Sequence, residues 1–358
     1  MNGDQPGSLF PTVFGRNLLG EIPNFAPWPY LVVTMEDLWS KFKHHFDENM
    51  ADVFFVRTLE YETLIEQLKE LPKFNSVIGL GGGQAVDVAK LIAWNRKLPL
   101  WHVPTSLSVN APFAQRAALR FDGNVRYMAW AVPEAVYVDF DIIQNAPAYL
   151  NRSGVGDIFC YHTAHFDWKF AQDVGKCEAK WPYDDRMVAD ASAVLNSVMA
   201  NLDDIRDVNE NGIRVLTKAI QWGGAAFHNY GWNPRHIEGS EHFLFYTLEY
   251  LTRKPFIHGQ PVSLGVFIVS ALQDNKADAM LQAIHSVGVD IRPEAMGVTW
   301  DDVAEAMRRM QSYATEQGLW YSVVHEKPVT ETFIASVRDR ITEIYGPWNE
   351  PRVVAANR

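Results

Sequence analysis

Three side chains in the second half of the chain have the types and positions of a metal-ligand set. Asp157 lies in "SGVGDIF" and His242 in "EGSEHF", each at the expected start of a helix, and His258 follows in "FIHGQP" after a helix and a short turn. One carboxylate and two imidazoles are a normal ligand set for Zn²⁺ with a fourth position open to water or substrate, and the same set can hold Fe²⁺ or Ni²⁺. The sequence therefore predicts a site for one divalent metal, with Zn²⁺ as the first expectation.

Other histidines compete for the same role, because the chain contains 11 of them. His162 and His165 fall on the same expected helix as Asp157, and His236 lies shortly before His242. A histidine taken singly is more often a structural residue than a metal ligand, so the spacing alone leaves these three open as alternatives.

A glycine-rich stretch in the first half could bind an anion. "GLGGGQAVDVAK" (79–90) places Gly81, Gly82 and Gly83 between a buried apolar run and a helical one. Glycine lets backbone N–H groups approach an anion closely, and a helix N-terminus adds partial positive charge, so a diphosphate would fit. The stretch has neither the G-x-G-x-x-G pattern nor a P-loop lysine, so a plain structural turn is an equal alternative. Asp87 and Lys90 are spaced as an exposed ion pair.

A second loop follows the next apolar run. In "VPTSLS" (103–108), the hydroxyls of Thr105, Ser106 and Ser108 could donate to a nucleotide. Open α/β sheets bind ligands outside the carboxyl ends of their strands, which is where both loops are expected. Taken alone, this loop is better explained as a capped turn.

The elements that would position these residues change in kind near residue 150. Before it, short runs rich in β-branched and aromatic residues alternate with helical stretches, which predicts a parallel sheet covered by helices. The expected strands are 29–34, 52–56, 76–81, 99–104, 125–130 and 135–140, and the expected helices are 61–71 and 84–94. After it, six stretches are helical and none is strand-like. We therefore expect an α/β nucleotide-binding domain (1–150) followed by an all-α domain (151–358).

Composition limits the classes of function. The chain has 358 residues, 47% of them hydrophobic and 21% charged, as in ordinary soluble proteins. Its formal charge of −11 disfavours nucleic-acid binding. No apolar run approaches the roughly 18 to 20 residues of a membrane span. The two cysteines, Cys160 and Cys177, suit a reducing compartment, and no signal peptide is recognisable, so we expect a cytoplasmic protein.

Five stretches together resemble one family. "GLGGGQAVDVAK", "VPTSLS", "NRSGVGDIF", "EGSEHFLF" and "IHGQPVSLG" occur in the order and approximate spacing of sn-glycerol-1-phosphate dehydrogenases, over roughly residues 75 to 275. That family belongs to the superfamily of iron-containing alcohol dehydrogenases, glycerol dehydrogenases and dehydroquinate synthases. The resemblance implies a dehydroquinate synthase-like fold and implies that Asp157, His242 and His258 are the metal ligands and catalytic residues. It also implies NAD(P) contacts at Gly81, Gly82, Gly83, Gln84, Ala85, Val86, Asp87, Thr105, Ser106, Leu107 and Ser108.

The sequence departs from the family where the family contacts substrate. After "PT-x-x-S" the family continues with His-Asp-Gly, whereas Val109 and Asn110 stand here, and the family's histidine four residues after its first metal histidine is replaced by Tyr246. These departures imply the same chemistry on a different substrate, with Asn110, Asp157 and Tyr246 as substrate contacts. Three arginines are candidate contacts for a phosphate or carboxylate, although a surface or structural role is the better explanation of each one taken singly: Arg116, Arg120 and Arg235.

The expected function is that of a metal-dependent, NAD(P)-linked dehydrogenase. It would interconvert a small polyol or sugar-phosphate-type alcohol with its ketone or aldehyde. We also expect the protein to form a homo-oligomer and to bind neither nucleic acid nor a membrane. Glu36 follows the first expected strand, where an acidic group accepts from ribose hydroxyls, and this favours NAD over NADP. Two alternatives stay open. One is a dehydroquinate synthase-like cyclase or lyase, which would need a cluster of basic residues around a phosphate that the sequence lacks. The other is a non-catalytic binding protein.

Overall fold

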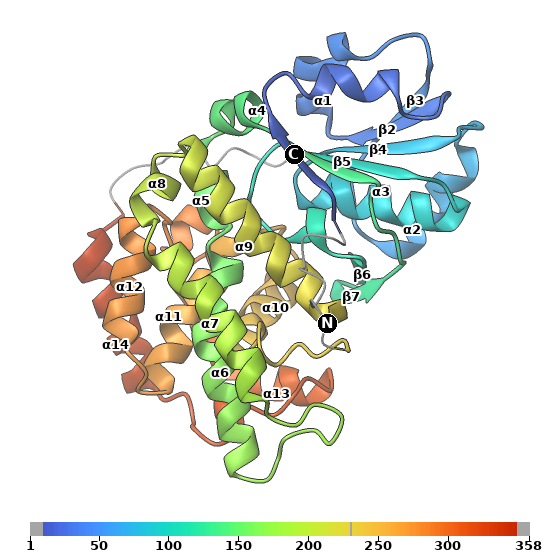
Figure 1. Ribbon diagram of the computed structural model, residues 1–358. Helices are drawn as coiled ribbons and strands as arrows, with labels where there is room; N and C mark the ends of the chain where they lie inside the picture. Colours follow the sequence, from blue (N-terminus) through green and yellow to red (C-terminus); the bar gives the residue numbers. More distant parts are fainter. Residues whose placement is uncertain (1–9, 230, 349–358) are drawn as a thin grey trace. The chain divides into compact units, whose positions relative to one another are not determined.

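The computed structural model describes residues 10–229 and 231–348, which pack as two units. The first unit contains the described residues up to Asn151 together with Val208–Trp232, and the second contains Arg152–Asp207 and the described residues from Asn233 onward. Helix α9 (Glu210–Asn229), which the sequence analysis placed in the second domain, thus belongs to the first unit (Figure 1). A Cβ added at Gly224 of α9 would lie 2.4 Å from the Phe113 carbonyl oxygen, so the helix lies directly against that backbone.

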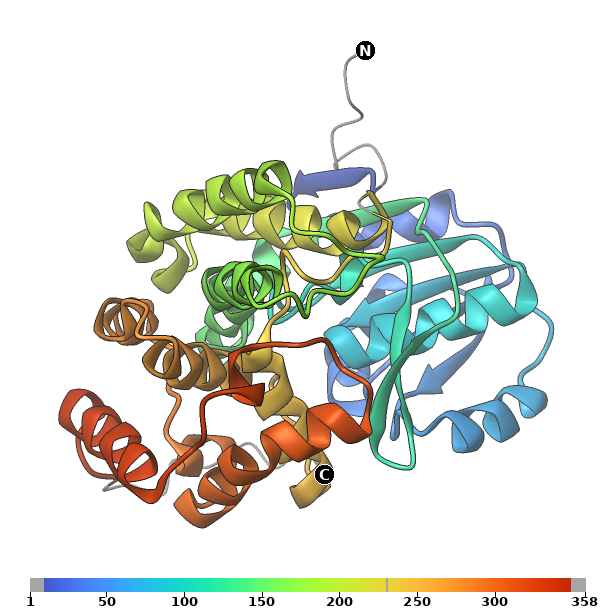
Figure 2. The ribbon, with the colours of Figure 1, turned by 90° about the horizontal axis from the view of Figure 1, so that it is seen from below.

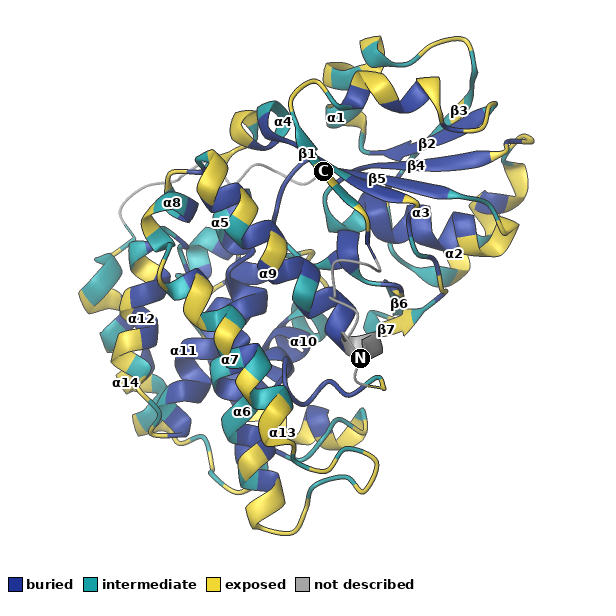
Figure 3. Cartoon of the chain, viewed as in Figure 1, coloured by how far each residue is buried: buried dark blue, intermediate teal, exposed yellow. Residues whose placement is uncertain are grey.

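The first unit is built on a six-stranded sheet with the order β1-β8-β5-β4-β2-β3, and all its neighbouring strands are parallel. Every residue of β2, β4 and β5 is buried (Figure 3), which explains why their sequences are continuous apolar runs. The strands of this sheet are β1 (Thr12–Gly15), β2 (Tyr30–Thr34), β3 (Met50–Phe55), β4 (Ser76–Gly81), β5 (Leu100–Pro104) and β8 (Ala135–Asp139).

One expected strand of the first unit lies elsewhere. The run expected at 125–130 forms β7 (Asn124–Met128), which pairs antiparallel with β6 (Ala117–Phe121) in a separate hairpin. The α-helices that accompany the sheet in sequence are α1 (Glu36–Phe42), α2 (Tyr61–Gln67), α3 (Gly83–Arg96), α4 (Phe140–Asn145) and α5 (Ala148–Ser153).

The second unit consists of helices and loops in its described residues, which confirms the expected all-α fold (Figures 1 and 2). Helices α10 and α11 form its centre, because most of their residues are buried and both pack against α6. Its α-helices are α6 (Gly156–Asp173), α7 (Asp185–Met199), α8 (Leu202–Arg206), α10 (Ser240–Thr252), α11 (Gly259–Leu272), α12 (Ala277–Ser286), α13 (Trp300–Glu316) and α14 (Glu331–Tyr345).

The helices of the described residues were also compared with the requirements of a membrane span. None of them combines the length and the hydropathy that crossing a bilayer takes.

Candidate metal centre and dinucleotide site

The first turns of α6 and α11 approach each other so closely that only glycine fits between them. A Cβ added at Gly259 would lie 1.7 Å from the Ser153 carbonyl oxygen, and one at Gly156 would lie 2.5 Å from the Gly259 carbonyl oxygen. Asp157 follows Gly156, and His258 precedes Gly259. This backbone contact therefore places a carboxylate and an imidazole side by side.

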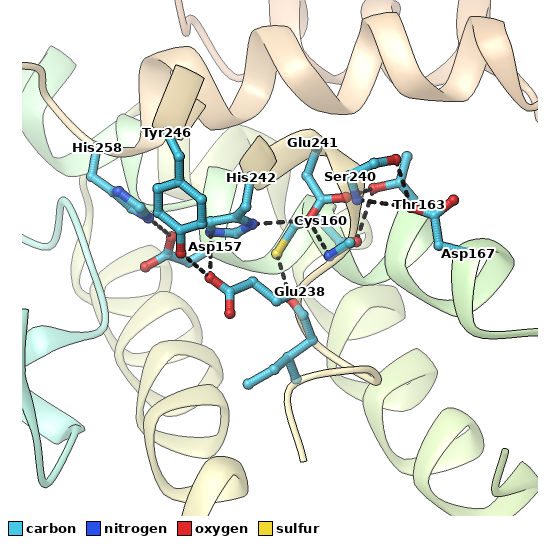
Figure 4. Close-up of polar contacts among 12 residues, drawn as sticks. Asp157, Cys160, Thr163, Asp167, Glu238, Ser240, Glu241, His242, Tyr246 and His258 are labelled. Atoms are coloured by element: carbon cyan, nitrogen blue, oxygen red, sulfur yellow. Dashed lines mark hydrogen bonds and ion pairs between the residues drawn. The ribbon is translucent and has the colours of Figure 1, made fainter. Parts of the chain in front are cut away.

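The structure brings the three predicted metal ligands together. Asp157 Oδ1 lies 2.9 Å from His258 Nε2, and the rings of His242 and His258 are 5.4 Å apart between centroids. Asp157, His242 and His258 each offer one ligand atom within 4.8 Å of the others (Figure 4). The Asp157 side chain is 4% exposed and that of His258 is 22% exposed, so solvent reaches the group on the His258 side. One carboxylate oxygen and two imidazole nitrogens fit a divalent metal.

His242 is held by a carboxylate that the sequence analysis did not single out. Its Nδ1 lies 2.9 Å from Glu241 Oε1, and Glu241 also accepts from the Gly239 N–H and the Thr163 hydroxyl, both at 2.6 Å. A histidine whose Nδ1–H donates to a carboxylate presents Nε2 as its free electron pair, which is the usual arrangement of a metal-binding histidine.

A second unpredicted carboxylate lies on the other side of the His242 ring. Glu238 is buried, with its Oε1 3.7 Å from His242 Nε2, and it accepts a short hydrogen bond from the Tyr246 hydroxyl. Burial raises the pKa of the Glu238 carboxyl. Burial by itself lowers the pKa of His242, but Glu238 and Glu241 outweigh it and raise that pKa to about 9. The Glu238 and Glu241 carboxylates thus favour a positive charge at the His242 ring.

In the first unit, the glycine turn is sterically required. Gly81 ends β4 with φ +155°, and a Cβ there would lie 2.7 Å from the Cβ of Ala85. A Cβ on Gly83, the first residue of α3, would lie 2.8 Å from Val109 Cγ1. The first N–H groups of α3 have no partner within the helix, as at any helix start. A glycine turn followed by a helix N-terminus is the kind of backbone that suits an anion, so binding of a diphosphate here stays a prediction.

The second loop lies beside this turn, because β4 and β5 are parallel neighbours. The Thr105 N–H donates to the Gly81 carbonyl at 3.1 Å, and a Cβ on Gly82 would lie 3.5 Å from the Ser106 hydroxyl oxygen. The Leu107 N–H donates to the Asn151 side chain at 2.9 Å, which fixes the loop. The two predicted cofactor segments are thus adjacent at the carboxyl ends of two neighbouring strands, where open α/β sheets bind nucleotides.

Comparison with known proteins identifies the family. The family model of iron-containing alcohol dehydrogenases matches residues 33–147. The glycerol-1-phosphate dehydrogenase [NAD(P)+] of Thermofilum pendens is 32% identical over 269 residues, which are 72% of this chain and 76% of that protein. The enzyme of the same name from Thermococcus kodakarensis is 30% identical over 249 residues, or 69% of each chain. The chain belongs to the glycerol-1-phosphate dehydrogenase-like members of the iron-containing alcohol dehydrogenase family.

Solved structures agree with the fold of this iron-containing alcohol dehydrogenase. A probable glycerol dehydrogenase from Sinorhizobium meliloti 1021 has a TM-score of 0.69 at 19% identity, covering 93% of this chain and 95% of its own. The glycerol dehydrogenase of Schizosaccharomyces pombe has a TM-score of 0.66 at 18% identity, covering 95% and 93%. The predicted family and fold class are confirmed.

The alternative histidines of this dehydrogenase have structural partners. His162 Nε2 bonds to the Asn275 carbonyl at 2.9 Å, and His165 Nε2 bonds to the His236 carbonyl at 3.0 Å. His236 is itself buried, and burial lowers its pKa to about 3. Among the described residues, none of these three histidines belongs to a group of ligand atoms that could hold a metal.

The arginines that were candidates for binding an anion also have partners within the protein. Arg235 is buried and donates to the carbonyl oxygens of Tyr321 at 2.7 Å and Asp167 at 3.2 Å, so it is a structural residue. Arg116 stacks on the ring of Trp232 at 4.2 Å, and Arg120 donates to the Ala118 carbonyl within β6.

The ion pair expected on the surface of α3 is buried, which corrects the sequence analysis. Lys90 Nζ lies 2.7 Å from Asp87 Oδ1, and the two side chains are 0% and 7% exposed. Lys90 also donates to three carbonyl oxygens, those of Ala111 (3.0 Å), Ala114 (3.1 Å) and Arg116 (2.6 Å). The pair is buried because residues 111–116 cover this face of α3. It fixes the segment that follows Asn110, and it gives Asp87 a structural partner.

Proposed function

We propose that the chain is a metal-dependent, NAD(P)-linked dehydrogenase that interconverts a small polyol or phosphorylated polyol with its ketone or aldehyde. The observation that carries the proposal is the group of Asp157, His242 and His258, whose ligand atoms lie within 4.8 Å of one another. The two archaeal relatives that are named glycerol-1-phosphate dehydrogenase [NAD(P)+] support the reaction class.

The contacts of the residues in the second unit support the roles that we propose for them. Asp157, His242 and His258 would hold the metal, with Zn²⁺ as the first choice and Fe²⁺ or Ni²⁺ as alternatives. Glu241 holds the His242 ring, and the more exposed His258 marks the side from which substrate would enter. A bound metal supplies Lewis-acid polarisation of the substrate oxygen, and a nicotinamide supplies or accepts the hydride.

The first unit would bind the dinucleotide, with its phosphates at Gly81–Asp87 and further contacts from Thr105–Ser108. Glu36, which opens α1 with one residue between it and the end of β2, supports NAD because a carboxylate there can accept from ribose hydroxyls; its ion pair with Arg57 weakens its repulsion of a 2′-phosphate. Leu38 of α1 would lie 3.4 Å from a Cβ on Gly81, so this helix is next to the glycine turn.

Asn110 and Tyr246 stay predicted substrate contacts, and their departure from the family pattern is part of that prediction. Asn110 lies just before the segment that Lys90 fixes, and Tyr246 lies one turn after His242. The cytoplasmic location and the homo-oligomeric state also stay predictions.

A spectroscopic screen tests the proposal. Polyols, sugar phosphates and the corresponding ketones are supplied with NAD⁺, NADP⁺ or their reduced forms, and nicotinamide absorbance is followed. We expect turnover with at least one polyol-type substrate, loss of turnover on complete chelation, and recovery when a divalent metal is returned. Turnover that survives complete removal of metal would refute the metal-dependent mechanism.

A further inference from the structure

A buried carboxylate lies beside the metal-ligand group without belonging to it. Glu238 Oε1 is 3.7 Å from His242 Nε2, the ring nitrogen that Glu241 leaves available. With metal–ligand distances of about 2.1 Å, two ligands of one ion are at most roughly 4.2 Å apart. Among the described residues, Glu238 does not join Asp157 or His258 in any group of ligand atoms within 4.8 Å of one another. Glu238 is therefore a neighbour of the metal ligands and has another role.

Tyr246 fixes the direction of this carboxylate. Its hydroxyl donates to Glu238 Oε1, and its ring lies 5.9 Å from that of His242, one turn earlier on α10. Figure 4 shows the Glu238 carboxylate beside both the Tyr246 hydroxyl and the His242 ring. A carboxylate held in this way is ready to accept a hydrogen bond from a group that enters the site.

The surrounding charges decide which groups can enter. Asp157 and Glu241 add two further carboxylates, so the three carboxylates exceed the two positive charges of one divalent metal, and the buried Arg235 guanidinium is bonded to backbone carbonyls. Like charges in a buried site repel strongly, so a phosphate or carboxylate of the substrate is disfavoured beside Glu238. A neutral hydroxyl group, which donates a hydrogen bond, is favoured.

We propose that Glu238, positioned by Tyr246, accepts a hydrogen bond from a substrate hydroxyl next to the one that is oxidised. The site then selects vicinal diols and polyols over monohydric alcohols, and any phosphate of the substrate lies away from Glu238. This inference rests on the proposed function and names the substrate class of the same site.

The selectivity has a physical cause. Glu238 is buried, so a monohydric alcohol that fills the site leaves the carboxylate without the substrate's donor and also without water. Losing a hydrogen-bond donor costs a buried acceptor more free energy than it costs an exposed one. A site that binds a substrate hydroxyl therefore rejects an analogue without that hydroxyl.

The test compares two probe alcohols, glycerol and 1-propanol. The values of kcat/KM for both are measured with metal-loaded wild-type protein, Glu238→Gln and Tyr246→Phe at saturating dinucleotide, and the bound metal is counted in each protein. Glu249→Gln, two turns beyond His242 on α10, is the matched control. We expect wild type to prefer glycerol, and Glu238→Gln to reduce that preference about 10- to 100-fold, the effect of one hydrogen bond to a charged group. Tyr246→Phe should reduce it less.

Two readouts separate this role from a structural one. Glu238→Gln should lower kcat/KM for glycerol while leaving that for 1-propanol unchanged or raising it, because a buried amide without a donor costs less free energy than a buried carboxylate, whereas a damaged site would lower both. Its metal content should stay at the wild-type value. An unchanged preference, or metal lost from Glu238→Gln, would overturn the assignment of Glu238 alone. Wild-type protein that holds metal and dinucleotide yet oxidises neither alcohol nor any phosphorylated polyol would instead overturn the proposed function.

Discussion

The contact between Glu241 and His242 gives the proposed metal centre its defined geometry. Residues adjacent on a helix point in different directions, so their sequence positions do not predict that they touch. They do touch here, because the His242 Nδ1 faces back to Glu241 at 2.9 Å while Thr163 and Gly239 hold the carboxylate in place. Glu241 therefore acts through His242 as a positioning residue.

Replacing Glu241 should weaken metal binding more than it weakens the fold. We expect Glu241→Gln to lower the affinity for Zn²⁺ about 10- to 100-fold, as is typical when the outer partner of a ligand histidine is lost. The measurement is a competition titration with a chelator of known affinity, and Glu249→Gln on the same helix is the control. Equal affinities for Glu241→Gln and wild type would show that the contact has no part in holding the metal.

Residue types alone predicted the three proposed metal ligands but not the two glutamates beside them. Asp157, His242 and His258 stood out because carboxylate and imidazole at helix starts suit a metal. Glu238 and Glu241 lie within a few residues of His242, but glutamate near a helix start is common for electrostatic reasons, so only their burial reveals a role in the site.

At the scale of elements, the crossing of α6 and α11 determines whether Asp157 and His258 meet. The added-Cβ distance of 1.7 Å from Gly259 to the Ser153 carbonyl oxygen leaves no space for any side chain. The sequence contains both glycines beside the predicted ligands, but a glycine before a helix is also an ordinary turn residue, so the crossing could not be predicted from it.

A methyl group at this crossing should disturb both stability and the metal site. We expect Gly259→Ala to lower the free energy of unfolding by about 1–3 kcal/mol through overpacking, and to lower metal affinity by moving His258 away from Asp157. Chemical denaturation and the same chelator competition measure the two effects. Gly20→Ala, where the nearest atom to the new Cβ is 3.6 Å away, should change neither. Wild-type values for Gly259→Ala would mean that the crossing readily adapts.

The Lys90–Asp87 pair shows where helical spacing alone misleads. An i,i+3 pair is usually exposed, but residues 111–116 cover this one, and a contact from a distant segment is invisible in the periodicity of α3.

Removing the lysine should therefore be costly. We expect Lys90→Met to lower the free energy of unfolding by about 3–5 kcal/mol, because it leaves Asp87 as a buried charge without its partner. Lys69→Met removes the exposed pair with Glu66, whose side chains are 59% and 71% exposed, and should cost less than about 1 kcal/mol. Denaturant titration of both variants gives the comparison, and equal small losses would contradict the buried pair.

At the scale of the whole molecule, the alternation of strands and helices followed by helices alone was enough to predict the fold class. It could not assign α9 to a unit, because an amphipathic helix shows that one face is buried but not which partner buries it. The same limit applies to β7, whose strand propensity says nothing about whether it joins the main sheet or a hairpin.

Buried histidines should make the stability of the molecule sensitive to acid. Burial lowers the pKa of His102 in β5 from 6.5 to about 3, so between these values the unfolded chain binds a proton that the folded chain does not. The contribution of His102 to the free energy of unfolding is fully present above pH 6.5. It falls as the pH is lowered, by about 2 kcal/mol between pH 7 and pH 5.

Denaturation of wild type and His102→Asn across this range isolates the contribution of His102. The difference between the two proteins at about pH 8, where histidine is neutral in both states, gives the packing cost of the substitution. The variant should then lose less stability than wild type on going to pH 5. Parallel curves for the two proteins would show that His102 takes up its proton in the folded state as well.

The central claim is that Asp157, His242 and His258 together hold one divalent metal, and metal stoichiometry tests it most directly. Wild type, Asp157→Asn, His258→Ala and the control His162→Ala are stripped with chelator, equilibrated with Zn²⁺, desalted and analysed for bound metal, with circular dichroism to verify that each is folded. We predict one ion per chain in wild type and in His162→Ala, and none in folded Asp157→Asn or His258→Ala. One tightly bound ion retained by folded His258→Ala would contradict the account.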